Sequence, residues 1–119
     1  MALPVLDEDA LVDRMGPLGD RAPEVIDLWI ATVGERVEAI ATAVRANVTH
    51  SLAVAAHTLR GSAMYVGASR LADHCAEIER QLHAGKRPDS LSELAVQIRQ
   101  DAADTTAALR ATTVLTLPD

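Results

Sequence analysis

Four long segments of the sequence carry aliphatic residues at every third or fourth position. This spacing places the aliphatic side chains on one face of an α-helix, which has to be buried against other helices. The first segment runs from near Pro23 to near Asn47, the second continues to Gly67, the third ends at Gly85, and the fourth begins at Ser90. Because short connections join them, the helices must run mostly antiparallel to bury these faces together. The sequence therefore predicts an all-α, antiparallel up-and-down four-helix bundle.

The predicted helix ends rest on capping and turn residues. Asn47 or Thr49 is expected to cap the second long helix, and the Ser90 to Glu93 stretch, SLSE, is a capping box for the last one. A shorter helix with acidic residues in its first turn is predicted over residues 7–14, and it is expected to end at Gly16-Pro17. We expect this additional N-terminal helix to cover one end or one flank of the bundle.

The expected core consists of the aliphatic stripes of the four long helices. The inward-facing positions are Ile26, Trp29, Ile30, Val33, Val37, Ile40, Val44, Leu52, Ala55, Ala56, Leu59, Ala63, Val66, Leu71, Cys75, Ile78, Leu82, Leu91, Leu94, Ile98, Ala102, Thr105 and Leu109. The chain has no Phe, one Trp and one Tyr, so small aliphatic residues must build this core. Cys75 falls on a stripe and is expected to be a small buried hydrophobe rather than a reactive thiol.

Composition excludes several classes of function. At 119 residues, the chain is expected to form a single domain over residues 1–119. Its formal net charge is −6 and its basic residues are scattered, which argues against nucleic acid or an anionic membrane surface as a partner. No apolar run approaches the roughly 20 residues of a bilayer span, and no signal peptide is evident. With a single cysteine, the sequence predicts a cytoplasmic protein without direct membrane contact.

One histidine in the second long helix faces away from the predicted core. At about 100° per residue, His57 lies roughly 150° from the centre of that helix's apolar stripe. Its neighbours at i±3, i±4 and i+7 include Ala53, Val54, Gly61 and Met64, which are small or apolar. An outward histidine with such neighbours suggests a docking patch with a nucleophile at its centre, and Gly61 would keep the space beside the imidazole open.

Two charged residues are expected near this histidine. Arg60 lies one turn further along the helix and offers cationic donors to an anion held at the ring, with phosphate the natural candidate. A neutral imidazole nitrogen accepts a phosphoryl group when its other nitrogen carries the proton and is held by an acceptor. Glu79 lies about 70° off the core stripe of the next helix and is our candidate for that acceptor.

The sequence AHTLRGSAMYVGASRL, residues 56–71, resembles the signature of histidine-containing phosphotransfer (HPt) domains. In that family an Ala-His pair precedes a hydrophobe, a basic residue and glycine, with Gly-Ala a short interval later. The following LADHCAEIE, residues 71–79, is also similar to the family's next helix. The resemblance implies that His57 is phosphorylated, that Arg60 lies beside it, that Gly61 gives the partner room, and that Glu79 hydrogen-bonds the ring.

The sequence departs from the family pattern in two places. One concerns the basic residue beside the histidine, and the other concerns residues expected to affect the choice of partner. The basic position is more often lysine, so Arg60 keeps the charge and alters its geometry. Met64 and Tyr65 occupy positions that are commonly small or polar in the family. We therefore assign these two residues, with Ala53 and Val54, to partner binding.

The resemblance implies a phosphorelay intermediate. Its histidine accepts a phosphoryl group from a receiver-domain aspartyl phosphate and passes it to another receiver aspartate, while the receiver holds Mg²⁺. The expected partners are receiver domains of response regulators, a hybrid sensor histidine kinase, or both, and the chain is expected to be a monomer without a bound cofactor. It contains no glycine-rich phosphate loop, in agreement with a carrier that has no kinase or ATP-binding activity of its own.

Two other functions fit the residues less closely. The same patch could dock a receiver domain without accepting phosphate. Alternatively, His50 and His57, seven residues apart on one face, could contribute to a metal site, although a third ligand is not evident. The NVT triplet at 47–49 matches a glycosylation acceptor but would not be modified in a cytoplasmic protein.

Overall fold

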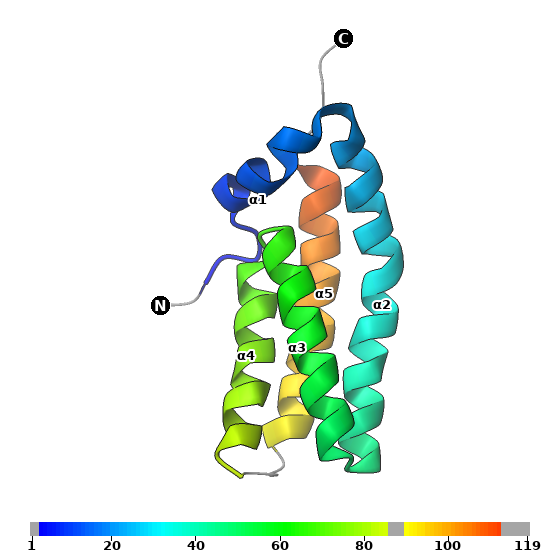
Figure 1. Ribbon diagram of the computed structural model, residues 1–119, viewed down its shortest axis with the longest axis vertical. Coiled ribbons are helices and arrows are strands. Elements are labelled where there is room, and N and C mark those ends of the chain that lie inside the picture. The colour runs from blue at the N-terminus through cyan, green and yellow to red at the C-terminus, as the bar shows by residue number, and fades with distance from the viewer. Residues whose placement is uncertain (1–2, 86–89, 113–119) are drawn as a thin grey trace.

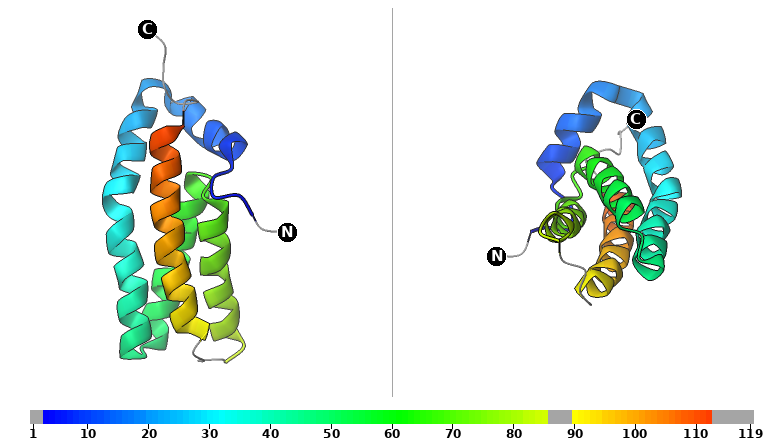
Figure 2. Two further views of the ribbon diagram at one scale, coloured as in Figure 1. Left: turned by 180° about the vertical axis from the view of Figure 1, so that it is seen from behind. Right: turned by 60° about the horizontal axis from the view of Figure 1, so that its bottom comes forward.

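Four long helices form an antiparallel up-and-down bundle in the computed structural model, which describes residues 3–85 and 90–112 (Figure 1). The helices are α2 (Ala22–Ala46), α3 (Thr49–Tyr65), α4 (Ser69–His83) and α5 (Ser90–Ala111). Each helix packs extensively on the next, and α5 closes the ring against α2 (Figure 2). This is the all-α architecture that the periodicity predicted, and no strand occurs in the described residues.

A short helix, α1 (Glu8–Met15), lies across one end of the bundle (Figure 1). Asp7 caps it, since its side chain accepts a hydrogen bond from the backbone N–H of Ala10 at 3.1 Å. A 3-10 segment, η1 (Gly16–Arg21), then leads into α2. The prediction of an additional N-terminal helix is therefore confirmed, although the chain continues in helical turns beyond the Gly-Pro pair.

The core follows the predicted stripes closely. Most of the predicted positions are buried, while Ile30, Val44, Ala55, Leu82 and Leu94 are partly buried at its edge. Cys75 is fully buried, as expected. Helix α1 adds Leu11 and Met15, which are also fully buried. The short N-terminal helix is therefore part of the core and not only a cover.

The turn between α2 and α3 corrects one predicted cap. Asn47 adopts the left-handed conformation, with φ of 59°, and ends α2, while Val48 occupies the N-cap position of α3. Asparagine tolerates this conformation better than most residues, which explains why it closes a helix here. The prediction that Asn47 or Thr49 caps the following helix is therefore wrong, because Thr49 is already helical.

The start of α5 agrees with the prediction in position but differs in detail. Ser90 is the first helical residue, one position later than a capping box requires, and its hydroxyl donates to Gln81 Oε1 on α4 at 2.9 Å. This hydrogen bond joins α4 to α5.

Within residues 3–85 and 90–112, no helix is both long enough and apolar enough to cross a membrane.

Gly67 holds α1 against the turn between α3 and α4. Its φ is 74°, and its carbonyl accepts a hydrogen bond from the Asp7 N–H at 2.7 Å. A Cβ at this position would lie 2.5 Å from the Asp7 carbonyl oxygen and 3.2 Å from the Leu11 nitrogen. Only glycine therefore fits both the conformation and the contact.

Gly67→Ala is expected to lower the free energy of unfolding by about 2 kcal/mol or more, since backbone strain adds to a clash with backbone atoms. Urea denaturation followed by circular dichroism measures the change. Gly34→Ala is the matched control, because Gly34 lies within α2 and a Cβ there would meet nothing within 4 Å. A Gly67→Ala protein as stable as the parent would contradict this account of the docking of α1.

Candidate functional site

His57 lies on the outer face of α3, where the helical geometry predicted it. Its side chain is 70% exposed. The Nδ1 atom of the ring lies 3.3 Å from Glu79 Oε2 on α4. The two helices therefore hold an exposed imidazole against a carboxylate that is 22 residues away in the sequence.

Arg60 joins the same cluster from one turn further along α3. Its Nη2 lies 3.3 Å from His57 Nδ1, and its Nε lies 2.6 Å from Glu79 Oε1. The contact with Glu79 is an ion pair whose angles are not those of a hydrogen bond. Glu79 therefore faces His57 with one oxygen and Arg60 with the other, and all three side chains meet at one point between α3 and α4.

Two hydrogen-bond arrangements are open to the imidazole. When Nδ1 carries the proton, it donates to Glu79 Oε2, and Nε2 keeps a free lone pair. In the other tautomer, Nδ1 accepts from Arg60 Nη2. The first arrangement supplies a nucleophilic nitrogen on an exposed ring together with a carboxylate that offsets positive charge on the ring.

Gly61 leaves the surface beside His57 uncovered. It is exposed, and a Cβ built on it would meet no heavy atom within 4 Å. Most side chains at this position would project over the face of α3 that carries His57, because positions i and i+4 are neighbours on a helix. The glycine therefore keeps open the approach to the imidazole.

The predicted partner-binding residues surround His57 on α3. Val54 and Met64 are about half exposed, at 51% and 49%. Ala53 is partly buried, and Tyr65 is exposed at the end of the helix. We call this set, Ala53, Val54, Met64 and Tyr65, the apolar rim. Exposed apolar side chains around a polar centre are typical of a protein-docking surface.

Cys75 lies in the core between this site and α5. Burial raises the pKa of its thiol to about 12, and the negative charges of Glu79 and Asp101 act in the same direction, against the opposing effect of Arg60. The thiolate is therefore scarce at neutral pH, and the cysteine acts as a core residue.

The two-histidine metal hypothesis gains no support from the geometry. His50 lines a groove between α2 and α3, whereas His57 contacts Glu79 on α4. Among the residues that the structure describes, no three His, Cys, Asp or Glu side chains are placed to hold a metal ion.

Sequence reasoning missed a buried polar cluster between α4 and α5. Asp101 is 1% exposed and contacts Nδ1 of His74, while Gln97 Nε2 donates to its other oxygen at 3.1 Å. Thr105 donates to the Asp101 carbonyl at 2.7 Å. The available signal was the position of Asp101 beside Ala102 and three residues after Ile98, which places an acidic residue on the apolar stripe of α5.

Comparisons with known proteins identify a matching family model and a similar fold. A family model for the Hpt domain matches residues 24–112. The crystal structure of histidine-containing phosphotransfer protein B (HptB) from Pseudomonas aeruginosa superimposes with a TM-score of 0.83. The two proteins are 24% identical, and the match covers 92% of this chain and 94% of the other. No curated protein sequence matches the chain.

Proposed function

Because the chain belongs to the Hpt domain family and acts in histidine phosphotransfer within a phosphorelay, we propose that His57 is the residue that carries the phosphoryl group. The observation that carries this assignment is the exposed ring of His57, whose Nδ1 lies 3.3 Å from Glu79 Oε2. Hpt domains interact with receiver domains, so the donor is a receiver aspartyl phosphate.

The proposed transfer uses Nε2 of His57 as the nucleophile. Its lone pair forms the N–P bond while the bond from phosphorus to the aspartyl oxygen breaks, and the electron pair leaves with the receiver carboxylate. The imidazole gains positive charge as the bond forms. Glu79 accepts the hydrogen bond from Nδ1–H and offsets that charge. The reverse reaction passes the phosphoryl group to the aspartate of a second receiver.

The remaining site residues support this reaction. Arg60 supplies a guanidinium beside the ring for the phosphoryl oxygens, Gly61 provides access, and the apolar rim contacts the receiver. Mg²⁺ is held by the receiver, and this chain contributes neither a cofactor nor ATP binding. The partners are receivers of response regulators or of a hybrid sensor histidine kinase, and the chain acts as a monomer.

Incubation with a phosphorylated receiver domain and Mg²⁺ tests the proposal. The expected product is an acid-labile, alkali-stable phosphohistidine, and fragmentation by mass spectrometry should locate it on His57. Label on His50, His74 or His83 would overturn the assignment. Binding of the receiver without any label on the chain would instead indicate a docking module that does not accept phosphate.

Gly61→Gln is expected to slow transfer from the receiver by about 10-fold or more, because a long side chain would occupy the approach to His57. The helix should become slightly more stable, since glycine is a poor helix former and nothing obstructs the new side chain. Gly34→Gln introduces the same side chain in α2, beside the groove between α2 and α5, and serves as the control. Transfer rates are measured from a time course of labelling in which samples are quenched at set times. Equal rates for the two variants would refute the role of Gly61.

A further inference from the structure

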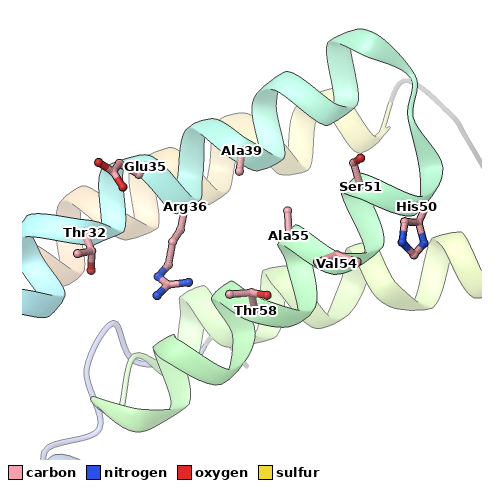
Figure 3. A pocket seen from close by; sticks show the side chains of 9 residues that line it. All are labelled: Thr32, Glu35, Arg36, Ala39, His50, Ser51, Val54, Ala55 and Thr58. Atoms are coloured by element: carbon pink, nitrogen blue, oxygen red, sulfur yellow. The ribbon is translucent and has the colours of Figure 1, made fainter.

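A groove runs between α2 and α3 directly beside the candidate site (Figure 3). It is an open cavity of about 600 Å³. Val54, which belongs to the apolar rim, and Thr58, the neighbour of His57, line its α3 wall. The groove is therefore continuous with the face that a receiver must cover to reach His57.

Arg36 reaches from α2 into this groove toward Thr58 (Figure 3). Its Nε is buried and has no hydrogen-bond partner. Among the described residues, Arg36 forms no ion pair, whereas Arg60, whose buried Nε also lacks a hydrogen bond, has a Glu79 oxygen 2.6 Å away. The groove thus contains a cation with an unsatisfied donor next to the docking face.

An unsatisfied guanidinium N–H in a partly buried site is unfavourable, and a carboxylate is its best-matched partner. The groove also contains Glu35, but among the described residues it forms no ion pair with Arg36, so the guanidinium stays available to a carboxylate from a partner. A carboxylate on the receiver would pair with Arg36 and fix how the receiver sits over His57.

We propose that Arg36 is a specificity-determining residue, which binds a carboxylate side chain of the docked receiver domain in the α2/α3 groove. This inference rests on the proposed function, because it assumes that a receiver covers His57. Arg36 acts on docking and does not contact the reacting atoms.

The test compares Arg36→Met with the parent in two phosphorylation reactions. With a phosphorylated receiver that transfers to the parent, the variant is expected to show a KM raised by about 10-fold at nearly unchanged kcat, since a hydrogen-bonded charge pair is lost from the interface. With phosphoramidate, a small donor that needs no docking, labelling of His57 should be unchanged. The thermal midpoint should be unchanged or higher, because the unsatisfied donor is removed.

Arg110→Met is the matched control, because Arg110 lines the groove between α2 and α5 and its loss changes the net charge equally. A receiver KM for Arg36→Met within two-fold of this control would overturn the inference, as would a loss of phosphoramidate labelling or a clear loss of stability. Failure of the proposed function would be distinct, because the parent itself would then carry no phosphate on His57.

The carboxylate is identified by a second step of the same experiment. Each Asp and Glu on the receiver surface outside its phosphorylation site is replaced in turn by Asn or Gln, and transfer to the parent and to Arg36→Met is compared. One replacement should raise the KM for the parent and have no further effect with Arg36→Met. If every replacement acts equally on both proteins, no carboxylate pairs with Arg36 and the inference is wrong.

Discussion

His57→Gln is expected to abolish phosphoryl acceptance, with transfer from a phosphorylated receiver reduced by roughly 1000-fold or more. The glutamine side chain is similar in size and polarity, but its amide nitrogen has no available lone pair to attack phosphorus. The variant should fold normally, because the His57 side chain is 70% exposed and makes its contacts at the surface. Transfer is measured as label retained after alkaline treatment.

His83→Gln provides the control for this experiment. His83 is an exposed histidine in the last turn of α4, outside both the site and the α2/α3 groove. Its replacement should leave phosphate acceptance within about two-fold of the parent, since surface substitutions away from a site have small effects. Unchanged labelling of His57→Gln would show that another residue carries the phosphoryl group.

Asp101→Ala is expected to lower the free energy of unfolding by about 3 kcal/mol or more, one of the largest effects for a single substitution in this chain. Asp101 is 1% exposed and is the partner of both His74 and Gln97. The alanine variant leaves two polar side chains without their acceptor and creates a void between α4 and α5. Urea denaturation at neutral pH measures the loss.

Asp104→Ala is the matched control on the same helix. Asp104 accepts a hydrogen bond from Gln100 Nε2 at 2.9 Å, also across one turn, but it lies near the surface. Its replacement should cost less than about 0.5 kcal/mol. If Asp101→Ala costs no more than this control, the buried cluster does not stabilise the bundle. The double variant with His74→Ala should cost less than the sum of the two single variants, because the two residues share one interaction.

The fold could be predicted from the sequence because the hydrophobic residues that stabilise it recur at a regular spacing along each helix. The stripe from Ile26 to Ile40 in α2 and the stripe from Leu71 to Ile78 in α4 are buried as predicted, since hydrophobic burial depends on position around a helix axis. The same periodicity placed His57 and Gly61 on the outer face. Helix ends depend on single backbone conformations, and there the left-handed Asn47 departed from the prediction.

The parts of the site that depend on contacts between helices were less predictable. Periodicity indicates Glu79 because it lies at the flank of its helix. Its ion pair with Arg60 depends on how closely α3 and α4 approach, which periodicity does not determine. Arg36 and Asp101 were missed for the same reason. Whether a charged residue is buried or unpaired depends on side chains from a neighbouring helix, and only the packed structure brings those together.

Trp29 gives the proposed site an optical reporter of its own. The indole Nε1 of Trp29 donates to the carbonyl of Ser62 at 3.0 Å, and Ser62 directly follows Gly61. Trp29 is buried and is the only tryptophan in the chain. Its fluorescence therefore reports on the packing of α2 against the turn of α3 that carries Gly61. Docking by a receiver that lacks tryptophan can thus be followed in real time with the unlabelled natural sequence.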